Sequence, residues 1–257
     1  MQQMRVAGAA VGIVLVLAAA TPTLGAQAVQ AGSGASSLTR FTVRVENTSK
    51  PFTPKGSSGE ALAMLFSPGV WAVHTGANPL FTPGQIEPGL GLEGFAEAGM
   101  ARPFATSLGG AKGVIVGVFN RPVSKTTGAN GRSPLLEPGF HYEFVIEART
   151  GDRLSFAMMI GESNDGLVAT GAEGIALFDA SGRPVSGNLT SQVYLWDAGT
   201  EVNEEPGLGP NQGMRQGAPH AGDPERRPVR LMSEAEFGDR WPLASELVRI
   251  TLTPAKQ

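Results

Sequence analysis

Hydrophobic and polar residues alternate in several short stretches of the chain. In 39–46, Phe41, Val43 and Val45 alternate with threonine, arginine and glutamate, and 140–147 shows the same period of two. Successive side chains of a β-strand point to opposite faces of the sheet, so this pattern predicts strands with one buried face.

Other strands are predicted from apolar runs that end at turn residues. The run 113–120 is almost continuously apolar, which favours a strand covered on both faces. The sequence Thr-Gly-Asp at 150–152 separates 140–147 from 153–160, so we predict that these two segments pair as an antiparallel hairpin. Shorter strands are expected at 174–178, which leads into a turn at 179–182, and at 189–197 and 247–253.

Helical patterns are confined to short segments. The stretches 59–66 and 90–98 can each form one or two helical turns, because prolines such as Pro68 and Pro88 prevent longer helices. The stretch 203–228 is crowded with glycine, proline and charge, and is expected to be a long surface loop. Short strands with few helices predict an all-β fold, and we expect an antiparallel β-sandwich rather than a barrel.

The chain begins with the pattern of a secretory leader. Arg5 precedes an apolar run at 11–20, and small residues follow as far as Ala28. The run is shorter than the roughly 20 residues that a transmembrane helix needs, and the small residues supply a cleavage pattern. The alternative is an uncleaved N-terminal anchor. We expect three regions: a signal peptide at 1–26, a flexible linker at 27–37 and one β-sandwich domain at 38–257.

Composition narrows the class of protein. The chain has no cysteine, so its stability cannot depend on disulfides. Its formal net charge is −3 and it has no basic cluster, so neither nucleic acid nor an anionic membrane is an expected partner. We expect a secreted or periplasmic protein without a stable membrane anchor after the leader is removed.

Three segments of the chain together resemble the spondin N-terminal domain: 154–165, 174–179 and 196–201. This domain is found in bacterial exported proteins and, more distantly, in the matrix proteins F-spondin and mindin. The similarity covers 38–254. It implies a β-sandwich similar to C2 domains, in an adhesion or recognition protein that holds calcium at one end of the sandwich. The chain departs from the family in having no cysteine, no thrombospondin-type repeat and Gly166 in place of a bulky aromatic residue.

The resemblance also implies carboxylate ligands for calcium. Asp165 matches the aspartate of a Ser-x-Asp loop, and Asp197 matches the aspartate of an aromatic-Asp-Ala-Gly string. A third carboxylate belongs to the preceding strand, for which we choose Glu147. Calcium takes six to eight oxygens, so backbone carbonyls, asparagine or water would complete the shell. In the predicted hairpin Glu147 lies near the turn and far from Asp165, so Glu137 and Glu201 remain alternatives. The two aspartates could instead be turn residues that accept backbone hydrogen bonds.

No catalytic arrangement is evident in the sequence. His74, His141 and His220 lie far apart without the spacing of a zinc site, and no Gly-x-Ser-x-Gly motif occurs. We therefore predict a non-enzymatic, calcium-binding recognition or adhesion domain that contacts a surface or extracellular protein or glycan through loops at one end. The alternatives are a metal-dependent hydrolase using the same acidic rim and a metal-free structural protein of the cell envelope.

Overall fold

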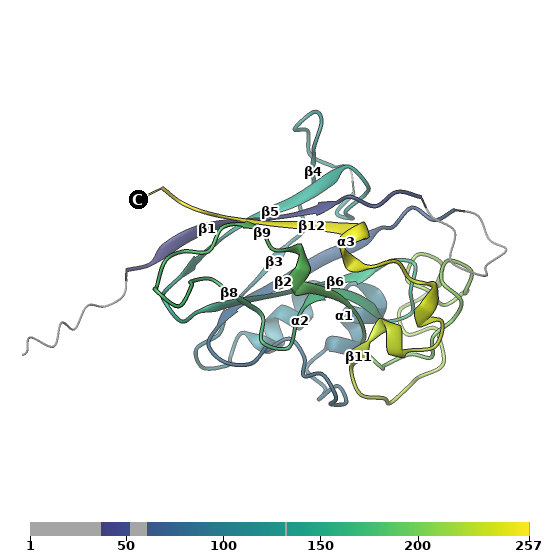
Figure 1. The fold of residues 1–257 in the computed structure, drawn as a ribbon. Coiled ribbons are helices and arrows are strands. Elements are labelled where there is room, and N and C mark those ends of the chain that lie inside the picture. The colour runs from purple at the N-terminus through teal and green to yellow at the C-terminus, as the bar shows by residue number, and fades with distance from the viewer. Residues whose placement is uncertain (1–36, 52–60, 132, 257) are drawn as a thin grey trace, which may run out of the picture. The chain divides into compact units, whose positions relative to one another are not determined.

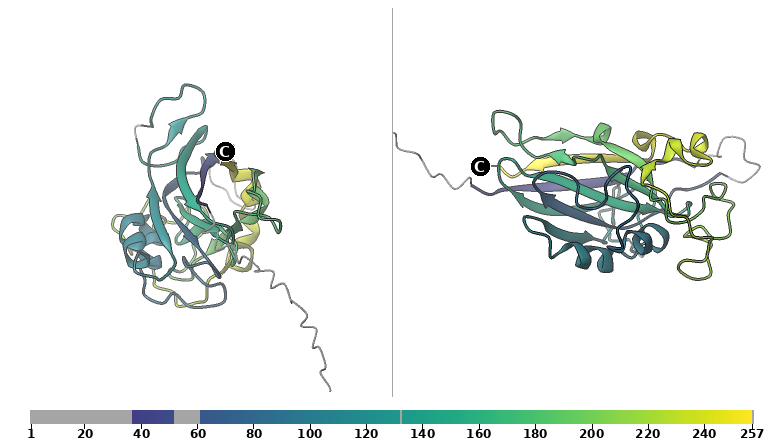
Figure 2. Two further views of the ribbon diagram at one scale, coloured as in Figure 1. Left: turned by 90° about the vertical axis from the view of Figure 1, so that its left-hand side faces the viewer. Right: turned by 90° about the horizontal axis from the view of Figure 1, so that it is seen from below.

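Two antiparallel sheets make up most of the computed structural model, which describes residues 37–51, 61–131 and 133–256 (Figure 1 and Figure 2). The five-stranded sheet has the order β4 (Val123–Ser124), β5 (Phe140–Ala148), β1 (Thr39–Asn47), β12 (Val248–Pro254) and β9 (Gly187–Asn188). The seven-stranded sheet has the order β11 (Arg230–Leu231), β10 (Val193–Asp197), β7 (Gly166–Thr170), β6 (Arg153–Ile160), β2 (Phe66–His74) and β3 (Ile115–Phe119), with β8 (Ile175–Ala176) paired to β6. The predicted all-β sandwich is confirmed.

Short helices complete the fold. They are α1 (Leu92–Ala98), α2 (Ala101–Leu108), α3 (Ala244–Leu247) and the 3-10 turns η1 (Thr190–Gln192), η2 (Met232–Glu234) and η3 (Gly238–Arg240). The predicted helix at 90–98 is confirmed as α1. None of the helices in the described part of the chain is long and apolar enough to cross a membrane. The predicted signal peptide lies outside the described residues.

The alternation in β1 builds the core between the two sheets. Phe41, Val43 and Val45 are fully buried there. Arg44, on the outer face, donates to Glu143 of the neighbouring strand β5 at 2.8 Å. The polar half of the pattern therefore forms cross-strand ion pairs on the outside of the five-stranded sheet.

The seven-stranded sheet is covered on both faces, and β6 lies near its centre. Leu154, Phe156 and Met158 of β6 enter the core between the sheets, whereas Ala157 and Met159 enter a second core with α1 and α2. Figure 1 shows these two helices on the side of the sheet away from β1 and β12. Because both faces are buried, β6 lacks the polar alternation of β1.

The predicted hairpin between 140–147 and 153–160 is wrong, although both strands exist. β5 belongs to the five-stranded sheet and β6 to the seven-stranded sheet, so the chain passes from one sheet to the other. The turn itself is present: the N–H of Asp152 donates to Arg149 O at 3.0 Å, and the Asp152 carboxylate accepts from the N–H of Arg149. Turn residues thus fix a reversal of the chain without fixing which strands pair.

Strand β2 replaces the end of the predicted helix at 59–66, whose first residues are outside the described ones. The described residues 61–65 are not helical, and β2 begins at Phe66. Pro68 lies in a register shift between Phe66 and Gly69, where its missing N–H does not interrupt the ladder. Strand β7 and helix α2 were likewise not predicted, because β7 is buried on both faces and α2 contains Pro103 in its first turn.

The remaining predictions are largely confirmed. The strand at 113–120 is present as β3, but it lies at the edge of its sheet and Ile115 is exposed, so the expected burial on both faces is wrong. The turn at 179–182 closes through a hydrogen bond from Gly182 N–H to Asp179 O at 2.9 Å. The stretch 203–228 forms neither helix nor strand, in agreement with the predicted loop.

Candidate functional site

Strand pairing brings Asp165 and Asp197 together at one end of the seven-stranded sheet. β7 and β10 are antiparallel, and Gly166 at the start of β7 lies opposite Asp197 at the end of β10. Asp165 immediately precedes Gly166, and its carbonyl oxygen accepts a hydrogen bond from the N–H of Ala198 at 3.3 Å. Two aspartates separated by 31 other residues in the sequence therefore meet at the same sheet edge.

The side chain of Asp165 is fully buried and holds the loop that follows β10. Its Oδ2 accepts hydrogen bonds from the N–H of Thr200 at 2.7 Å, the hydroxyl of Thr200 at 3.2 Å and the N–H of Glu201 at 3.2 Å. Its Oδ1 is also buried but has no hydrogen-bond partner among the described residues. One oxygen of this carboxylate is thus used by the fold, and the other is free.

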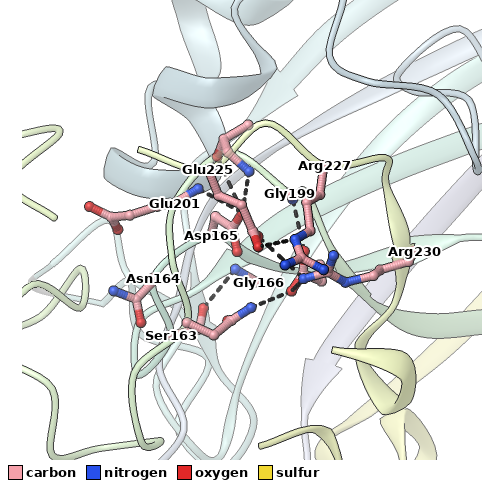
Figure 3. A network of polar contacts seen from close by, with 12 residues as sticks. Ser163, Asn164, Asp165, Gly166, Gly199, Glu201, Glu225, Arg227 and Arg230 are labelled. Carbon is pink, nitrogen blue, oxygen red and sulfur yellow. Dashed lines mark hydrogen bonds and ion pairs between the residues drawn. The ribbon is translucent and has the colours of Figure 1, made fainter. Parts of the chain in front are cut away.

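Asp197 is also fully buried, but both of its oxygens are used. Oδ1 accepts from the N–H of Gly199 at 2.8 Å, which is the contact of an Asx turn. Oδ2 accepts from the side chains of Asn203 and Arg230, the latter at 3.2 Å. Arg230 also contacts Glu225 at 3.2 Å (Figure 3).

The two buried aspartates leave this region short of positive charge. The pKa of Asp165 is raised to about 8, first by burial and second by the charge of Asp197. The hydrogen bonds from Thr200 and Glu201 lower it but do not offset those two effects. Arg230 contacts Asp197, not Asp165. The Asp165 carboxylate therefore favours either a proton or a cation at its free oxygen.

A second set of polar contacts fixes the long loop between β10 and β11. The carboxylate of Glu204 accepts from Asn164 Nδ2 at 3.2 Å, Asn211 N–H at 3.0 Å and Asn211 Nδ2 at 3.0 Å. Asn164 Oδ1 in turn accepts from the N–H of Glu204 at 2.9 Å. Gln212, which is fully buried, donates to the carbonyl of Glu205 at 2.8 Å. These side-chain contacts add to backbone pairing at the ends of the loop, where the N–H of Val202 donates to Asp223 O at 2.9 Å and the N–H of Glu225 donates to Thr200 O at 2.7 Å.

Glu147 does not join the aspartates. It lies on β5 in the other sheet, half-exposed, and accepts from Arg40 of β1 at 3.0 Å. The choice of Glu147 as the third ligand is therefore not supported by its position, because its carboxylate serves a cross-strand ion pair on the outer face. Glu137, the first alternative, is exposed in the segment just before β5.

Glu201, the second alternative, touches the pair only through its backbone. Its N–H donates to Asp165, whereas its own Oε1 accepts from the N–H of Gly222 at 2.6 Å. In Figure 3 the Glu201 side chain extends away from Asp165. The structure thus brings together the two expected aspartate ligands. None of the three candidate glutamates, Glu147, Glu137 and Glu201, adds its carboxylate to them.

The sequence did not reveal Arg230, Asn203, Asn164 or Glu204 as part of this network. Each lies in or beside a polar segment without periodicity, so no pattern marks its partner. The available signal is compositional: the loop combines carboxylates and amides with glycines at which a side chain has no room. A Cβ at Gly199 would lie 2.3 Å from Arg227 O, and one at Gly222 would lie 2.2 Å from Glu201 Oε1.

A serine and a histidine do meet elsewhere, inside the fold. His74 Nε2 lies 2.9 Å from Ser155 Oγ, and both residues are buried. Nδ1 of His74 has no hydrogen-bond partner among the described residues, so no carboxylate orients the ring. A hydrolytic triad needs an accessible nucleophile and an oriented base, and this pair provides neither.

The comparisons with known proteins do not assign the chain to a family. A scan against protein-family models finds none that matches, and a search of curated proteins finds no matching relative. The functional conclusion therefore rests on the residues and their geometry.

Proposed function

We propose that this chain is an exported, non-enzymatic recognition domain of the spondin type, stabilised by calcium at Asp165, that contacts a surface or extracellular protein or glycan through its long loop. The observation that carries the proposal is the free, buried Oδ1 of Asp165 beside the charge of Asp197. The sequence resemblance and the leader pattern support the family and the export.

Calcium suits the free oxygen of Asp165. Calcium binds carboxylate, carbonyl and water oxygens, and a cation there would offset the burial of a second negative charge next to Asp197. Asp165 would bind through Oδ1, while Asp197 contributes its charge, because both of its oxygens already accept hydrogen bonds. With so few charged ligands, the affinity should be weak, on the order of 0.1–1 mM.

The loop between β10 and β11 offers the surface for a partner. Val202, Leu208 and Met214 are exposed apolar side chains on this loop. Met214 also lines a cavity of about 330 Å³ together with residues at the start of β2 and the end of α1. Exposed apolar side chains within a polar surface are typical of protein contact sites.

Melting curves with calcium and with EGTA test the metal part of this proposal. Calcium at ten times its Kd should stabilise the wild type by about 1.4 kcal/mol, which corresponds to roughly 3–6 °C for a domain of this size. Asp165→Asn removes the charge and keeps the shape, so it should abolish the shift. Asp223→Asn, an exposed aspartate on the same loop, is the matched control and should keep it.

The alternatives give different results. A metal-free envelope protein would show no difference in melting temperature between calcium and EGTA, either as the wild type or as Asp165→Asn. A metal-dependent hydrolase would show calcium-dependent turnover of an ester or glycoside panel that Asp165→Asn abolishes while the protein stays folded. For the recognition surface, replacing Val202, Leu208 and Met214 by serine should abolish binding to cell-surface fractions without changing the melting temperature in calcium.

A further inference from the structure

A group of metal-binding side chains joins α1 to the long loop, away from the aspartate pair. Glu93 and Glu97 are one helical turn apart on α1, so they lie on the same side of the helix. His220 comes from the loop between β10 and β11. One ligand atom from each of these three residues lies within 4.8 Å of the others, and they are the one such group among the described residues.

The packing of the loop explains why His220 reaches the helix. Its Nδ1 contacts Oε2 of Glu97, and its Nε2 lies 3.9 Å from the position that a Cβ would take at Gly94. Gln216 on the same loop donates to the carbonyl of Glu97 at 2.7 Å. Glu97 is buried, whereas Glu93 and His220 remain accessible to solvent. An ion could therefore reach the group from outside while one of its ligands is held inside.

Glu201 adds a buried carboxylate with one free oxygen to this region. It is only 1% exposed, and its Oε2 has no hydrogen-bond partner among the described residues. Oε1 is fixed by the N–H of Gly222, two residues after His220. The free oxygen thus belongs to a buried carboxylate that is hydrogen-bonded to the segment that carries His220.

We propose that Glu93, Glu97 and His220, with the buried carboxylate of Glu201 beside them, form a site for a divalent transition-metal ion that fastens the long loop to α1. One imidazole nitrogen with carboxylate oxygens suits Zn²⁺ or Mn²⁺, whereas calcium takes oxygen ligands alone. The site differs from the proposed calcium site in its residues and in its ligand chemistry. The spacing of the three histidines in the sequence could not indicate this site, because only His220 belongs to it. The other two ligands, Glu93 and Glu97, come from a helix far earlier in the chain.

Zinc titration of the full chain tests the site. The EDTA-treated protein is titrated calorimetrically with Zn²⁺ in the presence of millimolar calcium, so that Asp165 does not contribute. We expect one equivalent of Zn²⁺ per chain. His220→Ala and Glu93→Gln should each weaken the affinity for Zn²⁺ at least about tenfold, because each removes a ligand. Both side chains are exposed, so the variants should still fold. Glu201→Gln should weaken it too, while keeping an oxygen for Gly222.

The matched control is Glu236→Gln, an exposed carboxylate elsewhere, which should bind zinc as the wild type does. NMR gives a second readout, since the ring signals of His220 should shift on addition of Zn²⁺ while those of His74 stay in place. Absence of zinc and manganese binding by the wild type would overturn the proposal. So would unchanged zinc affinity in both His220→Ala and Glu93→Gln.

Discussion

Arg230 lies directly opposite Asp197 in the β10–β11 pair, and its guanidinium donates to Oδ2 of the aspartate at 3.2 Å. Asp197 is fully buried, and the side chain of Arg230 is only 17% exposed. Two strands of very different regularity, one at each end of the long loop, are therefore joined by a mostly buried ion pair.

Removal of the arginine should be costly because it leaves a buried charge without its partner. We expect Arg230→Met to lower the free energy of unfolding by about 3–5 kcal/mol, measured by urea denaturation. Arg249→Met, at an exposed arginine on β12, should change it by less than about 0.5 kcal/mol. Adding Asp197→Asn to Arg230→Met should restore part of the loss; a double variant as unstable as the sum of the singles would contradict this account.

Gly199 should tolerate no side chain. Its φ is +70°, and a Cβ would lie 2.3 Å from the carbonyl oxygen of Arg227. We expect Gly199→Ala to destabilise the protein by at least about 1–3 kcal/mol, because it adds a backbone clash to an unfavourable conformation. Gly217→Ala, on the same loop and with nothing within 4 Å of its Cβ position, should be close to neutral in the same denaturation experiment.

The histidines in the fold should make stability fall in acid. Burial lowers the pKa of His74 below its ordinary value of 6.5, and the charge of Arg153 lowers it further. The unfolded chain therefore binds a proton more readily than the folded one, so this stability is present above about pH 6.5 and is lost as the pH falls below it. Burial also lowers the pKa of His141.

Urea denaturation between about pH 7.5 and pH 5 measures this effect, with a slope of at most about 1.4 kcal/mol per pH unit for each histidine. His74→Gln should have a shallower dependence than the wild type, whatever its absolute stability. If the free energy of unfolding changes with pH equally in the two proteins, His74 does not contribute to the pH dependence of stability.

Glu204 should control the order of the loop more than the stability of the sandwich. Its carboxylate accepts three hydrogen bonds from Asn164 and Asn211. We expect Glu204→Ala to make the segment 205–219 several-fold more sensitive to limited proteolysis, since local opening depends on these contacts. The control variant Glu236→Ala should be cleaved by the protease at the wild-type rate. Equal cleavage rates for the two variants would show that Glu204 does not hold the loop in place.

How far the sequence predicts the fold depends on what covers each strand. β1 shows a clean alternation because one of its faces is open to solvent, and it was predicted correctly. β7 has all of its residues buried, so it carries no alternation to detect. β2 combines burial with Pro68, which favoured a break in the chain over a strand.

The site shows the same division. Asp165 and Asp197 were chosen through the resemblance, and the pairing of β7 with β10 brings them to one edge of the sheet, but their role as metal ligands stays a prediction. The position of Glu147 in the five-stranded sheet could not be predicted, because local turn residues do not reveal that β5 and β6 belong to different sheets. Arg230 contacts Asp197 and Glu204 contacts Asn164, in each case more than 30 residues away in the sequence, and no local period encodes such contacts.

The irregular loop between β10 and β11 is held by hydrogen bonds to Asp165, Asp197, Glu201 and Glu204, and by backbone pairing between its two ends. Its conformational entropy is therefore lost when the chain folds and not when a partner arrives. A ligand would therefore bind a preorganised surface. Its specificity would depend on shape complementarity to that surface rather than on a conformational change of the loop.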